Sequence, residues 1–212
     1  MSVTAQPAAA PSTPPLLRGL TFAGFPAAAI LVVNALKRAE ILPLTPVTQL
    51  AAPLAQLLAV ALIVSIFATV RSMQGRLGSI GVVLYVGSLV GLVGVEFVIN
   101  LVFPYVGAEA IPTLLAGPLG IAFTVASVSF LLGSIVFFVA LWRVDGAPKV
   151  AIVIALISTI PIALRMAFPE VVLQIALVGL AAGIVLLTVW LTKRASVEAV
   201  SFPNRANHAA TA

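Results

Sequence analysis

The chain has 212 residues, of which 62% are apolar and only 8% are charged, and its formal net charge is +5 at pH 7. A soluble domain carries about 25% charged residues, so this composition excludes an ordinary soluble domain. Apolar runs of about 18 residues or more predict membrane-spanning helices instead, with the lipid bilayer as the first partner. The positive charge is typical of an orientation signal in a membrane protein, and we expect no binding to nucleic acid.

Six apolar segments predict an all-α integral membrane protein, a bundle of six transmembrane helices. The segments span residues 19–36, 51–70, 78–103, 119–141, 150–168 and 171–191. The first is the shortest, so a bundle of five helices is the alternative. We expect a disordered tail over 1–15, because Ala, Pro, Ser and Thr there cannot bury enough apolar surface to fold. The bundle is expected over 16–194 and a polar tail over 195–212.

The residue types that most cofactor and catalytic sites need are scarce. The chain has no cysteine, and its single histidine, His208, lies in the polar C-terminal segment. These counts argue against a thiolate metal site and a haem ligand inside the membrane. No zinc-protease, nucleophile-elbow or P-loop motif occurs in the sequence. We therefore predict no cofactor, no metal and no catalytic residue, and we do not expect an enzyme.

The segment 78–103 has two different faces when its residues are placed at 100° per step. Three glycines, Gly87, Gly91 and Gly94, fall on one side. Small residues let a neighbouring helix approach closely, so this side predicts helix packing. The opposite side is polar, and it carries Tyr85, Glu96 and Asn100. With both faces directed at protein, we expect this helix at the centre of the bundle.

Glu96 is the sharpest functional candidate, because a carboxylate inside the hydrocarbon region costs about 2.5–3.5 kcal/mol or more. One interpretation is structural: the carboxyl is neutral, or bonded to Asn100, and joins helices. Another is functional, as a proton site, a cation site or an anchor for a ligand. In the third, the side chain only reaches up to the membrane surface.

Arg165 is the predicted partner of Glu96. It lies near the outer end of the segment 150–168, at a depth from which its long side chain can reach the acid, and Asn100 could bridge the two. The alternative is that Arg165 extends to the lipid headgroups or meets Glu170.

The last apolar segment carries a second small-residue motif. Gly179 and Gly183 form a Gly-x-x-x-Gly pair, which is typical of close helix contacts in membranes. Packing within the chain is the favoured use of this pair, and dimerisation is the alternative.

The basic residues predict the orientation. Six crossings put both termini on one side, which then carries eight Lys and Arg residues against three on the other. The eight are Arg18, Arg71, Arg76, Arg143, Lys149, Lys193, Arg194 and Arg205, and the three are Lys37, Arg38 and Arg165. Basic residues favour the cytoplasmic side, so we expect a multi-pass plasma membrane protein with both termini in the cytoplasm.

The region 130–194 resembles a broad group of uncharacterised bacterial multi-pass membrane proteins of the actinobacterial type. The resemblance rests on the stretches FLLGSIVFFVALWRVDGAPKVAIVIALISTIPIAL and VGLAAGIVLLTVWLTKR. It implies about six helices in a bacterial inner membrane, and it implies no activity.

Two functions follow as hypotheses. The first is a non-catalytic membrane protein that acts by helix packing with a protein partner, a second copy of itself or lipids. The alternative is a carrier of a small solute, an ion or a proton that uses Glu96, Asn100 and Arg165. A hydrated cavity that touches Glu96 would favour the carrier, and a Glu96 sealed by apolar side chains would favour the partner protein.

Overall fold

The structure, a computed structural model, describes residues 19–209, with side chains described for 19–196. Every regular element in this part of the chain is a helix, which confirms the all-α class. In chain order the elements are η1 (Thr21–Ala23), α2 (Gly24–Arg38), α3 (Pro46–Leu101), η2 (Phe103–Tyr105), α4 (Ile111–Ala116), α5 (Pro118–Trp142), α6 (Lys149–Ala163) and α7 (Glu170–Ala209). The predicted tail over 1–15 lies outside the described residues, as do the side chains of most of 195–212.

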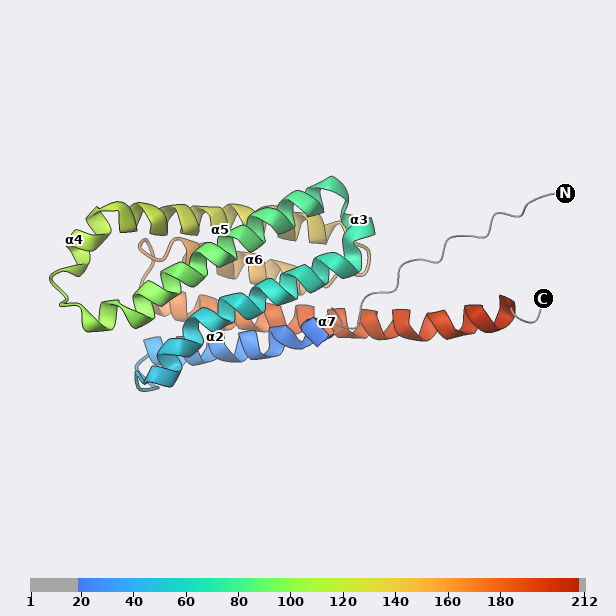
Figure 1. The fold of residues 1–212 in the computed structure, drawn as a ribbon, viewed down its shortest axis with the longest axis horizontal. Helices are drawn as coiled ribbons and strands as arrows, with labels where there is room; N and C mark the ends of the chain where they lie inside the picture. The colour runs from blue at the N-terminus through green and yellow to red at the C-terminus, as the bar shows by residue number, and fades with distance from the viewer. Residues whose placement is uncertain (1–18, 210–212) are drawn as a thin grey trace.

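Helix α3 joins two of the predicted segments, 51–70 and 78–103, into one hairpin of 56 residues. Gly75 forms the bend, with φ of 59° and ψ of −153°, a conformation that only glycine adopts readily. The helix runs along the bundle and then returns (Figure 1). The two arms, 46–74 and 76–101, end side by side, because Lys37 contacts both Thr48 and Asn100.

The start of α3 is fixed by its own sequence. The Thr45 hydroxyl accepts a hydrogen bond from the Thr48 backbone N–H, and the Thr48 hydroxyl accepts one from the Thr45 N–H. Pro46 occupies the first helical position, where its missing N–H costs nothing. This capping box places Thr48 beside the end of α2, where its carbonyl accepts a bond from Lys37.

Among the described residues, three helical stretches are long and apolar enough to cross a membrane: Pro46–Tyr105, Pro118–Trp142 and Glu170–Ser196. Helix α6, at 15 residues, reaches about 22 Å, which is less than the roughly 30 Å of the hydrocarbon core. The prediction of a helix over 150–168 was therefore too long. Pro161 lies in the last turn, where it removes a backbone donor, and the chain leaves the helix after Ala163. Arg165 consequently lies in a turn.

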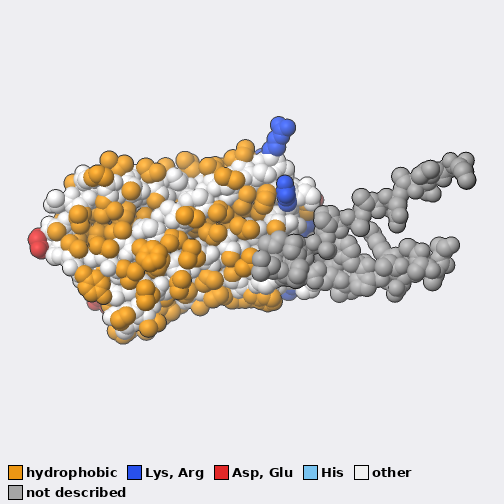
Figure 2. All heavy atoms as spheres, viewed as in Figure 1, with side chains coloured by type: hydrophobic (Ala, Val, Ile, Leu, Met, Phe, Trp, Pro, Cys, Tyr) orange, Lys and Arg blue, Asp and Glu red, His pale blue; other side chains and the backbone are white. Residues whose placement is uncertain are grey.

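The outer surface is apolar along the length of the bundle. Hydrophobic side chains cover the face shown in Figure 2, and Lys and Arg side chains stand at one end of it. Val83, Ile121, Val150 and Ile175 are each more than 65% exposed. Apolar exposure on this scale is compatible with a membrane protein and is unusual for a soluble monomer.

Glycines set the closest helix contacts. A Cβ at Gly81 would lie 2.9 Å from the Phe137 backbone, and one at Gly133 would lie 2.8 Å from Tyr85 Cα, so the second arm of α3 and α5 touch backbone to backbone. Gly183 meets Ala155 of α6 in the same way, at 3.0 Å. Helix α7 thus packs tightly on α6 and also contacts α2.

Candidate solute cavity

A cavity of about 280 Å³ lies inside the bundle. Its walls come from α2, both arms of α3, α5, the turn after α6, and α7. The polar and charged lining residues are Asn34, Lys37, Arg38, Gln56, Tyr85, Glu96, Asn100, Ser127 and Arg165. The volume equals that of about nine water molecules at liquid density, so the cavity can hold water or a small solute. Of the predicted polar site, all four residues, Tyr85, Glu96, Asn100 and Arg165, line this one space.

Asn100 joins the acid to a lysine. Its side-chain N–H donates to Glu96 Oε2 at 2.8 Å and to the Glu96 carbonyl at 2.9 Å. Its Oδ1 accepts from Lys37 Nζ at 2.6 Å, a charge-assisted bond between α2 and the second arm of α3. Lys37 also donates to the Thr48 carbonyl at 3.4 Å. The amide therefore separates the ammonium group from the carboxylate and contacts both.

Arg165 does not pair directly with Glu96. Both side chains line the cavity, but the ion pair found among the described residues joins Arg38 to Glu170, at 2.7 Å. Glu170 therefore pairs with Arg38 of α2 and not with Arg165. Asn100 connects Glu96 to Lys37, and not to Arg165 as predicted. The guanidinium of Arg165 makes no hydrogen bond with any described residue.

The charges around the cavity do not cancel. Arg38 is neutralised by Glu170 at the rim. Lys37 and Arg165 then remain against Glu96, so that two positive charges and one negative charge leave +1. A partly buried charge without a counter-charge is costly, and an anion in the cavity would reduce that cost.

Asn34 adds a second unsatisfied group. It is only 8% exposed and lines the cavity, yet its Oδ1 has no hydrogen-bond partner in the described part of the chain. Buried polar atoms are rarely left unpaired, so this amide indicates water or a ligand in the space beside it. Asn34 lies one helical turn before Lys37, and the two residues share a face of α2.

Aromatic rings close the cavity at its deep end. The Tyr85 ring lies 5.7 Å from the Phe130 ring and 5.5 Å from that of Phe137, as centroid distances. Phe138 completes the cluster, 5.7 Å from Tyr85. Tyr85 and Phe130 line the cavity directly. The close backbone contact at Gly133 holds this group of rings together.

The predicted glycine face points elsewhere. Gly87, Gly91 and Gly94 are exposed and line a shallow apolar groove between the second arm of α3 and α5. A Cβ at Gly87 or Gly94 would meet nothing within 4 Å, and one at Gly91 would only touch Ala126 at 3.5 Å. The expectation that another helix of the chain covers this face is therefore not met. Gly179 and Gly183 do face α6, where Cβ atoms would meet Ser158 and Ala155.

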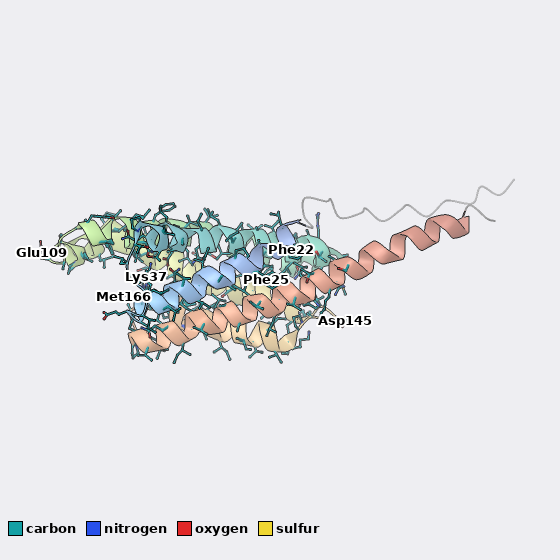
Figure 3. All side chains as sticks on the ribbon, turned by 90° about the horizontal axis from the view of Figure 1, so that it is seen from below. Phe22, Phe25, Lys37, Glu109, Asp145 and Met166 are labelled. Carbon is teal, nitrogen blue, oxygen red and sulfur yellow. The ribbon has the colours of Figure 1, made fainter. Side chains whose placement is uncertain are left out.

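Sequence reasoning missed Lys37 and Asn34 as site residues. The first predicted segment ends at residue 36, before Lys37, whereas α2 continues through Arg38. The signal that could have revealed them is the spacing of Leu31, Asn34 and Lys37, which places one apolar and two polar side chains on a single helix face. Figure 3 shows Lys37 in the same half of the molecule as Glu109 and Met166, with Asp145 at the opposite end.

Comparisons with protein-family models, with curated proteins and with solved structures found no match. Within the described residues, no group of three or more His, Asp or Glu side chains lies close enough to hold a metal ion. The geometry of the cavity is therefore the basis for any functional proposal.

Proposed function

We propose that the protein crosses the plasma membrane six times, with both termini in the cytoplasm, and carries a small anionic solute in the cavity. In this arrangement α5, α7 and the two arms of α3 cross as helices. The other two crossings combine the 15-residue helices α2 and α6 with the chain beside them, η1 before α2 and the turn after α6. The eight-to-three excess of Lys and Arg supports the orientation. The turns at Gly75 and Gly146 then face the cytoplasm, and the end that carries Lys37 and Arg165 faces outward.

The observation that carries the proposal is the unbalanced charge of the cavity. Lys37 and Arg165 face a single acid, Glu96, and Asn100 holds that acid away from the lysine. A carboxylate or similar anion would supply the missing negative charge and accept hydrogen bonds from both cations. A solute with a hydroxyl group could also donate to Asn34 Oδ1, the unpaired acceptor in the wall.

Binding and carriage, rather than catalysis, suit these residues. The described residues of the walls include no histidine and no cysteine, the usual general base and thiol nucleophile of enzyme sites. A set of charged groups with few internal partners is suited to hold a solute reversibly, because each group can exchange water for the solute.

Thermal unfolding of the purified protein in a non-ionic amphipol, followed by the fluorescence of Trp142 and Trp190, tests the binding site. We expect acetate or benzoate to raise the midpoint, and tetramethylammonium and glycerol to leave it unchanged. A solute at about 100 times its Kd stabilises by about 2.7 kcal/mol. Lys37→Met should abolish the effect, whereas Lys193→Met, which removes an exposed cation at the other end, should preserve it.

Glu96→Gln should increase the stabilisation by anions, whereas Lys37→Met should abolish it. The Glu96→Gln change removes the acid that competes with the solute for the two cations, so anions should bind more tightly to this variant. Stabilisation by cations, or an unchanged response in Lys37→Met, would refute the anion site. The carrier role is tested separately in proteoliposomes by efflux of the labelled anion, and binding without efflux would refute that role.

A second candidate function rests on the glycine groove. Its lining is almost wholly apolar and includes Ala122, Ala126 and Ser129 beside the three exposed glycines. Such a surface suits close packing against a helix of another membrane protein or of a second copy. Gly91→Leu would block that contact. If cross-linking captures an oligomer of the unaltered protein but not of Gly91→Leu, the result would support this alternative.

A further inference from the structure

The cavity separates charge from apolar surface along its depth. The described charged residues of the lining, Lys37, Arg38, Glu96 and Arg165, come from the ends of their elements at one end of the bundle. From Glu96 the cavity descends along the second arm of α3 to Tyr85, which is 11 residues or about 16 Å deeper. The walls of this lower part are formed mainly by Leu31, Leu89, Leu92, Phe130, Leu177, Leu180 and Ile184. Tyr85, the polar side chain at the bottom of this part, is uncharged.

A second space adjoins the cavity on its side. Arg165, Ser127, Val95 and Ile99 line both the cavity and a neighbouring crevice of about 360 Å³. The crevice lies between the second arm of α3, α5 and the end of α6, and its other walls include Phe103, Phe123, Val128, Leu164 and Met166. It exists because α6 ends at Ala163 and does not cover the full length of α5.

The crevice is accessible from the outer surface of the bundle. Val128 is 44% exposed, Leu164 is 40% exposed and Met166 is 87% exposed. In the proposed membrane arrangement this surface meets acyl chains. Arg165 thus stands between a lipid-facing crevice and the charged layer of the cavity.

We propose that the solute is a single-chain amphiphile with a monoanionic head, such as a long-chain carboxylate, and that it enters from the bilayer between α5 and α6. This inference rests on the proposed anion site. The head would lie between Lys37 and Arg165, and its single charge matches the net +1 of the site. The chain would occupy the apolar lower part, above the rings of Tyr85 and Phe130. Arg165 would contact the head first, at the junction of the two spaces.

A chain-length series on the unaltered protein tests the substrate class. Binding of straight-chain carboxylates from butanoate to dodecanoate is measured by scintillation proximity with the protein in a non-ionic amphipol. We expect affinity to rise by up to about fourfold per methylene group, the factor for burying one CH₂, until the lower part is filled. The alcohol of the same length should bind at least tenfold more weakly than the carboxylate.

Two pairs of variants test where the chain lies and how it enters. Ala59→Phe, which narrows the lower part of the cavity, should weaken the binding of dodecanoate but not that of butanoate. Val83→Phe, on the outer face of α3, should leave the binding of both unchanged. Ser127→Phe, at the junction, should slow the association of dodecanoate severalfold. Ser129→Phe, on the glycine groove of the same helix, is its matched control.

The outcomes separate the two proposals. If butanoate binds as tightly as dodecanoate, the amphiphile is refuted and the small-anion site stands. If no carboxylate of any length shows saturable binding, both proposals fail. If dodecanoate binds but associates at the same rate with Ser127→Phe as with Ser129→Phe, the lateral entrance is refuted.

Discussion

The contact between α3 and α5 predicts opposite effects for two glycine-to-alanine substitutions. A Cβ at Gly133 would lie 2.8 Å from Tyr85 Cα, 2.9 Å from the Leu84 carbonyl carbon and 2.9 Å from the Tyr85 nitrogen. All three are backbone atoms, so no side-chain rotation relieves the overlap and the two helices must separate. Overpacking of this kind costs about 1–3 kcal/mol. At Gly87, on the exposed side of α3, a Cβ would meet nothing within 4 Å.

Gly87→Ala should therefore be neutral or stabilising by about 0.5–1 kcal/mol, because alanine restricts the unfolded chain more than glycine does. The two variants should differ by about 1–4 kcal/mol in the free energy of unfolding. Reversible unfolding in mixed micelles of increasing sodium dodecyl sulfate content, followed by tryptophan fluorescence, measures this difference. Equal stability of Gly133→Ala and Gly87→Ala would refute the backbone contact, and with it the position of the aromatic cluster around Tyr85.

Two further regions make predictions of similar size. Gly75→Ala should destabilise by about 1–3 kcal/mol, because φ of 59° with ψ of −153° is strained for any residue with a Cβ, and the same micelle titration measures it. A double-mutant cycle of Lys37→Met and Asn100→Leu should give a coupling energy of about 1.5–3 kcal/mol for their charge-assisted bond. The cycle of Glu96→Gln and Arg165→Gln should give a smaller coupling energy, because these side chains line one cavity without an ion pair between them. A larger coupling energy would show that Glu96 and Arg165 do pair directly.

The helices were largely predictable from sequence because apolar runs and helix breakers are local signals. The segment predicted over 119–141 appears as Pro118–Trp142, and the break between the predicted segments 51–70 and 78–103 is the bend of α3 at Gly75. The error at 150–168 came from giving hydropathy priority over Pro161, which ends α6 early. A breaker close to the end of an apolar run therefore carries more information about the helix boundary than the run itself.

The side-chain partners could not be predicted in the same way. Helical periodicity correctly grouped Tyr85, Glu96 and Asn100 on one face, and all three line the cavity. It could not show which helix supplies the cation opposite that face, so Arg165 was chosen where Lys37 makes the contact. The same limit applies to glycine. Gly183 belongs to the regular motif and lies against the backbone of α6, but Gly81 and Gly133, which lie as close to a neighbouring helix, do not form such a motif.

The position of Asn100 is the feature that makes an anion site reasonable in this bundle. Had Lys37 contacted Glu96 directly, the two charges would have neutralised each other, and an incoming anion would have had to break that ion pair. Instead, the Asn100 amide oxygen accepts one hydrogen bond from Lys37, and the amide N–H donates to the Glu96 carboxylate. The Thr48 carbonyl takes a second lysine donor. The third donor of the ammonium group, and all five of the Arg165 guanidinium, have no hydrogen-bond partner among the described residues. A neutral spacer between acid and base therefore keeps Lys37 in place without neutralising its charge, which is the property that a reversible anion site requires.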